Sequence, residues 1–296
     1  MKISFCTTCM GRRQHVEATL LKNIQDNLPK TKDDPEVEFI LLDYNSKDGL
    51  QDWIKNNAAL KPFLDNSTLV YAKYPDATHF HHAHAKNMAH RLATGDVVCN
   101  LDADNYTGKD FARYLATEFA NGEHVLSHFT FGVMTHDPDK NGFFGRISMR
   151  REDFLALGGY SETRFKKGWG YEDTDFIMRA MKLGLESKPM FNKEYMGVIA
   201  HGNEERVKNT LQGVNSKDID DVSAGRAKNR HRNFILSSYF TRAQANHGNR
   251  FGEGKLMGLD NQPLPALKKL ESFVSIAKRN PFAVKSFQAT MCKRAP

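Results

Sequence analysis

The feature that most constrains the fold is the alternation of short apolar strands with amphipathic helices over the first 120 residues. The apolar pattern predicts strands at 2–8, 37–42, 69–74 and 97–101. Apolar residues at helical spacing predict helices at 13–28, 50–54, 83–93 and 111–119. This alternation is typical of βαβ units around a mainly parallel sheet. In such sheets ligands bind beyond the carboxyl ends of the strands.

The rest of the chain is less regular. It predicts strands at 125–131, 144–149 and 195–200, and helices at 151–157 and 172–183. We expect Gly95 to cap the helix at 83–93. A loop rich in glycine and aromatic residues runs from 158 to 171. From Asn203 on the sequence looks helical and polar, and Pro263 and Pro265 indicate a linker into a basic tail.

The composition describes a folded chain with a positive surface. At 296 residues and 40% hydrophobic content it can form one large domain, or a domain plus an appendage. No apolar run reaches the roughly 18 residues of a membrane span, and the N-terminus lacks a secretory signal, so we expect a cytoplasmic protein. The net charge is +7, with basic excess in residues 226–250 and 268–294. Such segments suit nucleotide phosphates, an anionic membrane, an acidic polymer or nucleic acid.

Several other ligand motifs are absent or incomplete. The four cysteines are too few for a disulfide framework, although Cys6 and Cys9 could form half of a zinc site or a redox pair. No glycine-rich dinucleotide loop or Walker loop follows the first strand. The histidines between His79 and His84 could bind zinc. We expect them instead to form a polar loop near bound phosphates.

Polar residues follow three of the predicted strands, at Thr7-Thr8, at Asp43-Tyr44-Asn45 and at Asp102-Ala103-Asp104. Because these strand ends meet at one edge of a parallel sheet, we expect the three segments to converge there. Asp102 and Asp104 would repel each other unless a cation lay between them. A hard divalent cation does this and can also bridge a pyrophosphate. The alternative is a simple turn, in which aspartate is common.

The segment before this acidic pair resembles glycosyltransferase family 2. The run from Ala83 to Asp96 contains Asn87 on a helix and a terminal Gly-Asp, and the sequence Leu-Asp-Ala-Asp at 101–104 follows. In that family a similar helix, a Gly-Asp pair, a strand and an Asp-x-Asp bind the donor. Lys86 stands where the family usually has arginine.

A second block resembles the acceptor-side signature of β-1,4-galactosyltransferases and polypeptide N-acetylgalactosaminyltransferases. It comprises residues 158–160 and 168–175, with Tyr171 in place of a glycine and Thr174 in place of an aspartate. Trp169 offers a flat apolar face for a sugar ring. Glu172 and Asp173 lie at a predicted helix N-terminus, where the helix dipole favours ionised carboxylates. An ionised carboxylate can take the proton of an attacking hydroxyl.

These resemblances imply a role for each candidate residue. Asp173 is the implied base, Glu172 holds an acceptor hydroxyl, and Asp104 with His201 binds Mn²⁺, or alternatively Mg²⁺. The implied donor-binding residues are Thr7, Thr8, Arg12, Asp43, Asn87, Asp102 and Asp104. The implied acceptor-binding residues are Trp169, Gly170 and Tyr171.

The resemblance implies a GT-A domain, a three-layer α/β/α fold, over residues 1–205. Its donor-binding half would be 1–105 and its acceptor half 106–205, with a helical basic extension at 206–296. The expected reaction is metal-dependent, inverting transfer of a hexose or N-acetylhexosamine from a nucleoside-diphosphate sugar to a hydroxyl of a glycan, a lipid-linked glycan or another acceptor. A uridine nucleotide is the favoured donor. Three alternatives remain: a nucleotidyltransferase, a nucleic-acid-binding protein, and a transferase acting on a polyanion such as modified DNA.

Overall fold

The computed structural model describes most of the first two thirds of the chain and a later segment. The described residues are 1–120, 122, 124–127, 145–165, 170, 172–182, 184–190, 192–201, 245–246 and 250–267. Trp169, Tyr171 and Cys292 lie outside them, as do the 268–294 basic segment and nearly all of the 226–250 segment. The expected helical character of the extension also lies outside the described residues, except where the chain returns at 245–246 and 250–267.

The described strands form a mixed sheet, as the alternating pattern predicted. Its order is β3-β2-β1-β4-β7-β6-β8, and the first four strands are parallel. The bounds are β1 (Lys2–Cys9), β2 (Glu36–Asp43), β3 (Leu69–Lys73), β4 (Val97–Asn100), β6 (His124–Ser127), β7 (Ile147–Arg150) and β8 (Glu186–Pro189). Strand β7 runs antiparallel to both β4 and β6, and β8 runs parallel to β6. A separate antiparallel pair joins β5 (Asn105–Tyr106) to β9 (Gly197–Val198).

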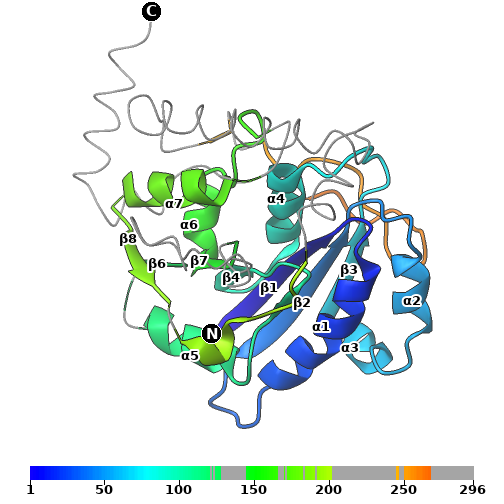
Figure 1. Cartoon of the computed structure of the whole chain (residues 1–296), viewed down its shortest axis with the longest axis horizontal. Helices are drawn as coiled ribbons and strands as arrows, with labels where there is room; N and C mark the ends of the chain where they lie inside the picture. Colours follow the sequence, from blue (N-terminus) through cyan, green and yellow to red (C-terminus); the bar gives the residue numbers. More distant parts are fainter. Residues whose placement is uncertain are drawn as a thin grey trace, which may run out of the picture.

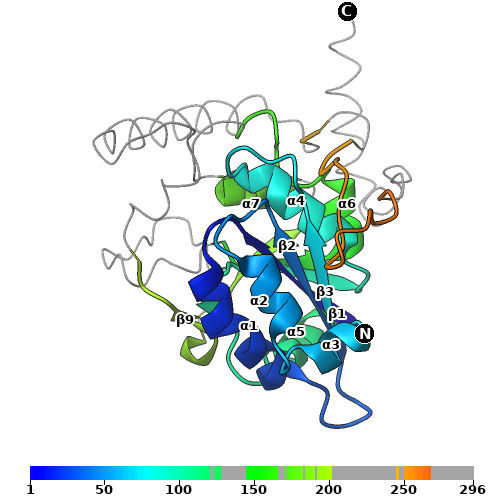
Figure 2. The ribbon, with the colours of Figure 1, turned by 90° about the vertical axis from the view of Figure 1, so that its right-hand side faces the viewer.

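Helices cover both faces of the sheet (Figures 1 and 2). One face carries α1 (Arg13–Asn27), α2 (Leu50–Asn56), α3 (Lys61–Asp65) and α5 (Phe111–Ala120). The other carries α4 (His82–Leu92), α6 (Arg151–Ala156) and α7 (Glu172–Lys182). A short 3-10 helix, η2 (Lys193–Tyr195), precedes β9. The predicted three-layer α/β/α arrangement is therefore confirmed.

The residues of β1 alternate between the two core layers. Ile3 and Phe5 pack with α1 and α5, whereas Cys6 packs with α4 on the opposite face. Cys9 belongs to the layer of Ile3 and Phe5, so the sheet separates the two cysteines. Burial raises the pKa of both thiols, that of Cys9 to about 12. A shared zinc ion or redox pair at Cys6 and Cys9 is therefore wrong, because residues three apart on a strand face opposite ways.

The predicted elements are present, with shifted ends, and four short ones were missed: α3, β5, β8 and η2. The expected cap at Gly95 is wrong, because α4 ends at Leu92 and an extended Ala93 follows. A Cβ on Gly95 would lie 2.5 Å from Ser4 Oγ and 2.8 Å from the Lys2 carbonyl oxygen. Gly95 therefore permits close approach to β1.

Residues 250–267, here the return segment, pack against the domain. Phe251 and Leu256 are buried in the core layer of α4. Met257 and Lys73 on β3 exchange two backbone hydrogen bonds of 2.8 Å. Pro263 pairs in turn with Met257. Pro263 and Pro265 are exposed, and the expected linker from them into a basic tail stays a prediction. The boundary at residue 205 stays a prediction.

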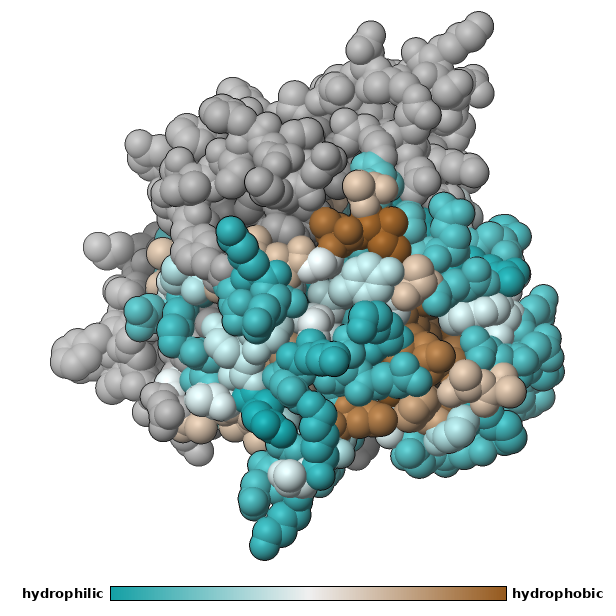
Figure 3. Space-filling view, turned by 60° about the horizontal axis from the view of Figure 1, so that its bottom comes forward, coloured by the Kyte–Doolittle hydropathy of each residue, from teal (hydrophilic) through white to brown (hydrophobic). Residues whose placement is uncertain are grey.

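The described surface is predominantly polar. Figure 3 shows one face, where hydrophobic side chains form small groups among hydrophilic ones. Among the described residues, the exposed large hydrophobic side chains are Met1 and Met181. Within the same residues, no helix combines the length and apolar character that crossing a membrane requires.

A candidate active site at the carboxyl edge of the sheet

The parallel pairing of β1 with β2 and β4 brings the three polar strand ends together. Cys9 at the end of β1 pairs with Asp43 at the end of β2. On the other side of β1, Cys6 pairs with Asn100, the last residue of β4. Asp102 and Asp104 follow Asn100 directly. The expected convergence of these segments at one edge is confirmed.

Asp104 meets His201, although 97 residues separate them. The β5–β9 pair makes this contact, because the Ile199 N–H donates to the Asp104 carbonyl (2.8 Å) and sets the direction of the chain into His201. His201 Nε2 lies 2.7 Å from Asp104 Oδ2, and Arg12 Nη1 lies 3.1 Å from the same Nε2. Burial would raise the pKa of Asp104, but the His201 hydrogen bond and charge, with Arg12, lower it overall.

The atom His201 Nε2 cannot satisfy both neighbours at once. It donates to Asp104 when it carries a proton, and it accepts from Arg12 when it does not. Asp104 Oδ2 and His201 Nε2 lie 2.7 Å apart, so these two side chains would together hold a divalent ion. One carboxylate and one imidazole also suit Mn²⁺.

These donors fit an ion that is bound together with its substrate. In the part of the chain that the structure describes, no group of three or more histidine, cysteine or acidic side chains could hold a metal. Asp104 and His201 would therefore supply only part of a coordination shell. Phosphate oxygens and water commonly complete such shells for hard divalent ions.

Asp102 lies between this pair and the rest of the site. Asn100 Nδ2 donates to Asp102 Oδ1 (3.0 Å) and to the Gly145 carbonyl (2.7 Å). A Cβ on Gly145 would lie 2.4 Å from Asp102 Oδ2, so this position has room only for glycine. Burial raises the pKa of Asp102, and the charge of Lys86 opposes that rise. Sequence reasoning missed Gly145, which no local pattern marks.

Glu172 and Asp173 occupy the first turn of α7, where the sequence placed them. Lys86 Nζ on α4 lies 3.0 Å from Glu172 Oε1 and 2.7 Å from Asp173 Oδ1. The side chains of Lys86 and Glu172 are each 5% exposed, but that of Asp173 is 20% exposed. Burial raises the pKa of Asp173 to about 7 against the effect of Lys86. For Glu172 the effect of Lys86, with other contacts, outweighs burial and lowers the pKa to about 2.

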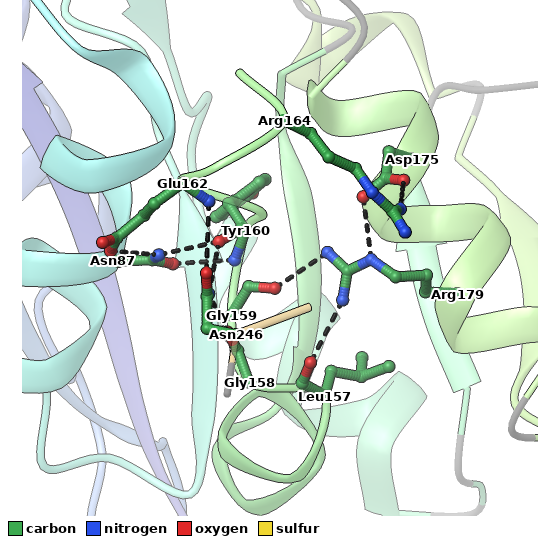
Figure 4. Close-up of polar contacts among 10 residues, drawn as sticks. All are labelled: Asn87, Leu157, Gly158, Gly159, Tyr160, Glu162, Arg164, Asp175, Arg179 and Asn246. Carbon is green, nitrogen blue, oxygen red and sulfur yellow. Dashed lines mark hydrogen bonds and ion pairs between the residues drawn. The ribbon is translucent and has the colours of Figure 1, made fainter. Parts of the chain in front are cut away.

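Asn87 fixes the loop that precedes α7 (Figure 4). Its Nδ2 donates to the Tyr160 carbonyl (2.9 Å) and to Glu162 Oε1 (2.8 Å), and its Oδ1 accepts from the Tyr160 N–H (2.7 Å). A Cβ on Gly159 would lie 2.3 Å from Asn87 Oδ1. The amide therefore joins the two sequence blocks directly. Its implied role in donor binding stays a prediction.

A buried arginine holds the same loop from the other side (Figure 4). Arg179 donates to Asp175 Oδ2 (2.8 Å) and to the carbonyls of Leu157 (3.1 Å) and Gly159 (2.8 Å). Arg164 donates to the other oxygen of Asp175 (2.7 Å). Sequence reasoning missed this network, although acid and arginine four residues apart on a helix were a usable signal.

Asn246, which follows the second block by about 70 residues, also binds this loop (Figure 4). Its Nδ2 donates to the carbonyls of Gly158 (2.6 Å) and Tyr160 (2.8 Å). No sequence pattern indicated this contact, because Asn246 and its partners lie more than 80 residues apart in the chain. The loop is therefore supported by residues both before and after it in the chain.

The remaining donor-side candidates differ in accessibility. Thr7 is buried and Thr8 is half-buried at the end of β1. Asp43 is completely buried, where its oxygens accept from the Ser46 N–H (2.6 Å) and the Tyr71 hydroxyl (2.7 Å). Burial raises the pKa of Asp43. A contact with a nucleotide base stays a prediction, and it would require Asp43 to exchange one of these partners.

Of the acceptor candidates, the structure describes Gly170, and its φ of 88° lies in the left-handed region that favours glycine. Trp169 and Tyr171 lie outside the described residues. Their implied contacts with an acceptor stay predictions.

The histidine cluster at 79–84 spans the start of α4 and has structural partners. His84 Nδ1 lies 2.7 Å from the Tyr44 hydroxyl, and its Nε2 lies 2.8 Å from the Glu253 carbonyl of the return segment. Because a carbonyl only accepts, Nε2 carries the proton and Nδ1 accepts from Tyr44. Burial lowers the pKa of His81 to about 4. The His84 contacts join the end of β2 to the return segment, and they use both ring nitrogens.

The fold and part of the sequence match known glycosyltransferases. A family model described as the N-terminal domain of galactosyltransferase matches residues 130–211, which include the second sequence block. Staphylococcus aureus TarS is similar in structure, with a TM-score of 0.52 and 16% identity over 82% of this chain and 44% of that chain. The mannosyltransferase PcManGT from Pyrobaculum calidifontis, in complex with GDP-Man and Mn²⁺, has a TM-score of 0.51 and 14% identity over 81% of this chain and 76% of that one.

The 1–349 part of TarS, in complex with UDP, is also similar, with a TM-score of 0.50 and 13% identity over 92% of this chain and 100% of that chain. No curated protein matches the sequence. The chain has the GT-A fold of glycosyltransferases, as the sequence predicted. The resemblance to galactosyltransferases is confirmed by the matched family model, whereas membership of family 2 stays a prediction.

Proposed function

We propose that this chain is a metal-dependent glycosyltransferase that moves a hexose or N-acetylhexosamine from a nucleoside-diphosphate sugar to a hydroxyl group. The observation that carries this proposal is that a histidine–carboxylate pair and a lysine–carboxylate cluster meet around one acidic motif. His201 Nε2 lies 2.7 Å from Asp104 Oδ2, and Asp102, two residues earlier, interacts electrostatically with both Asp104 and the Lys86–Glu172 pair. A donor and an acceptor bound at these two groups would be neighbours. The matched family model and the GT-A fold support the same reaction class.

The donor side has the groups that a nucleoside diphosphate needs. A divalent ion, when bound at Asp104 and His201, neutralises the charge that develops on the leaving diphosphate. Arg12, 3.1 Å from His201, can pair with phosphate oxygens. PcManGT was solved with GDP-Man and Mn²⁺, and TarS 1–349 with UDP. These complexes support a nucleotide donor and Mn²⁺, and we favour a uridine nucleotide.

The acceptor side offers a carboxylate that can act as base. Asp173 is the more exposed of the two acids, at 20% against 5% for Glu172. Its pKa, raised by burial to about 7, suits proton transfer near neutral pH. Asp173 takes the hydroxyl proton while that oxygen attacks the sugar carbon and the diphosphate leaves. A single displacement of this kind inverts the anomeric configuration. Glu172, whose pKa is lowered, stays ionised and holds a neighbouring hydroxyl.

The acceptor class is a wider proposal. We infer a glycan or a lipid-linked glycan, since Trp169 offers a face for stacking a sugar ring. The basic segments suit an anionic membrane or a polyanionic acceptor. The alternative of a nucleotidyltransferase is less favoured, because the matched family model and the similar structures described above are glycosyltransferases.

The test is an incubation of the whole chain with a panel of nucleotide sugars, with Mn²⁺ or with a chelator. We expect one or more donors to release nucleoside diphosphate only when Mn²⁺ is present. A control variant, Lys61→Met, should release nucleoside diphosphate like the wild type. It removes only an exposed ion pair with Asp65 on α3, which lies on the face of the sheet opposite α4 and α7. The proposal would be refuted if the chain bound none of the donors and hydrolysed none of them.

A further inference from the structure

We propose that Lys86 is a positioning residue for this reaction, which holds the Asp173 carboxylate toward the acceptor and joins it to the donor-side helix α4. The inference rests on the proposed function. It assigns to Lys86 a role that neither the donor motif nor the acceptor motif contains. It starts from the position of Lys86, whose charged group reaches two acids 86 and 87 residues away.

The first support is geometric. Lys86 Nζ binds one oxygen of each acid, at 3.0 Å from Glu172 and 2.7 Å from Asp173, so the second Asp173 oxygen has no bond to this lysine. Asp173 keeps 20% of its side chain exposed. Lys86 thus holds one Asp173 oxygen inside the protein and turns the carboxylate in a fixed direction.

The second support is charge balance. The titratable groups that interact with Lys86 include Asp102 after β4, Tyr160 in the loop before α7, and Glu172 and Asp173 on α7. On α4 itself, His90 also interacts with Lys86. Lys86 Nζ also lies 5.2 Å from the centre of the Tyr160 ring. Without the lysine, Glu172 and Asp173 would be neighbouring buried acids, and two such acids share a proton rather than both ionising. Lys86 therefore keeps the base in its proton-accepting form.

The third support is the residue that follows Lys86. Asn87 binds the Tyr160 backbone, so one turn of α4 fixes both the loop before α7 and the first turn of α7. The same helix begins at His82 and lies beside β1 and β2, whose ends form the donor side. A shift of α4 would therefore move the base together with the donor edge.

The experiment compares Lys86→Met and Lys86→Arg with the wild type. We expect Lys86→Met to bind the donor within about twofold of the wild type and to lose at least about tenfold in kcat at pH 7, because each unit by which the Asp173 pKa rises reduces its ionised fraction about tenfold. The acid limb of its kcat/KM profile should move to higher pH, so that the loss shrinks at pH 9. Lys86→Arg should recover most of kcat, because the cation remains.

Lys22→Met is the matched control, since Lys22 pairs with Asp26 on α1 but is 56% exposed. It should leave the pH profile unchanged. If Lys86→Met kept the wild-type acid limb, or lost donor binding and kcat equally, Lys86 would be only structural and the inference would be overturned.

A second measurement separates this inference from the proposed function. Urea denaturation at pH 8 compares Lys86→Met, Asp173→Asn and the double variant. We expect the double variant to be more stable than the sum of the single losses predicts, because it removes a buried acid together with its cation. If the wild type transferred no sugar, the proposed function would fail, but the stability comparison would still test whether Lys86 and Asp173 are coupled. If the stability losses of the two single variants simply added up in the double variant, the coupling would be refuted.

Discussion

The two acidic groups of the site have different cationic partners. On the donor side Asp104 faces the imidazole of His201, and Arg12 contacts the same imidazole nitrogen, Nε2. On the acceptor side Glu172 and Asp173 share a buried lysine. An imidazole can give up its proton and accept a metal ion in its place. A buried lysine paired with two carboxylates keeps its charge: burial alone would lower the pKa of Lys86, but the charges of Asp173 and Glu172 raise it well above its ordinary value.

The two sides therefore differ in whether their ion pairs can change partners. Under the proposed function, the donor side would replace one contact with another when a metal ion and diphosphate bind. The acceptor side would hold the proposed base, Asp173, in place before substrate binds. Its rigidity extends outward through Asn87 and Arg179, which fix the loop before α7 with five hydrogen bonds to backbone groups or Asp175. The predictions below separate the two sides.

The largest expected effect is on the acceptor side. Asp173→Asn should lower kcat by about 10²- to 10⁴-fold, the usual contribution of a general base. Donor binding, measured by calorimetry, should stay close to that of the wild type, because Asp173 contacts Lys86 rather than the donor edge. Equal losses in kcat and donor binding would show that the two sides cannot be separated.

A complementary loss is expected on the donor side. Asp104→Ala should weaken Mn²⁺-dependent donor binding by more than about 100-fold. Loss of a residue that only hydrogen-bonds a metal ligand already costs roughly 10- to 100-fold, and Asp104 is the proposed ligand itself. In chelator, the variant and the wild type should bind the donor equally weakly. If Mn²⁺ still strengthened donor binding to the variant as in the wild type, Asp104 would not be a metal ligand.

The rigid side should also be the more sensitive one in stability. Asp175→Ala leaves the buried Arg179 without its carboxylate, and breaking a buried pair costs about 3–5 kcal/mol of the free energy of unfolding. Urea denaturation measures this loss. Asp65→Ala removes the exposed partner of Lys61 and should change stability little. Similar losses in both variants would contradict the view of Asp175 as an internal support.

A smaller effect is expected from pH. Because burial raises the pKa of Asp173 to about 7, its carboxylate loses the proton-accepting form as pH falls. The rate should therefore be about tenfold below its plateau one unit under that pKa. The opposite sign holds for stability: a raised carboxyl pKa destabilises the folded state as pH rises from about 4 to 7. Asp173→Asn should remove that part of the pH dependence in denaturation measurements.

The sequence was sufficient for the first half of the fold. Periodicity located β1 to β4 with their helices, because each is a buried strand or an amphipathic helix. It missed β8, which is Glu-Ser-Lys-Pro, because an exposed edge strand carries no apolar alternation. It misread Gly95, because the contact that requires a glycine there comes from Ser4, 91 residues earlier.

The site was predicted in part. Motif spacing placed Asp102, Asp104, Glu172 and Asp173, and the contact of His201 with Asp104 agrees with the expected pairing. The lysine between the acids was noticed only as a departure from arginine. Its bonds depend on how α4 and α7 pack, and side-chain type alone does not reveal packing. Asn246 and Gly145 were missed for the same reason, since each acts through a contact distant in sequence.

The sheet closes its two described edges in different ways, which bears on how the chain avoids self-association. At one edge Lys73, the last residue of β3, exchanges two backbone hydrogen bonds with Met257 of the return segment, so a foreign strand would have to displace Met257 to pair with that end of β3. At the other edge β8 is exposed and carries Lys188 and Pro189. Lysine and proline on an edge discourage pairing with a foreign strand. Pairing of a foreign strand is thus opposed at the end of β3 by the return segment and at β8 by the lysine and proline in the strand itself.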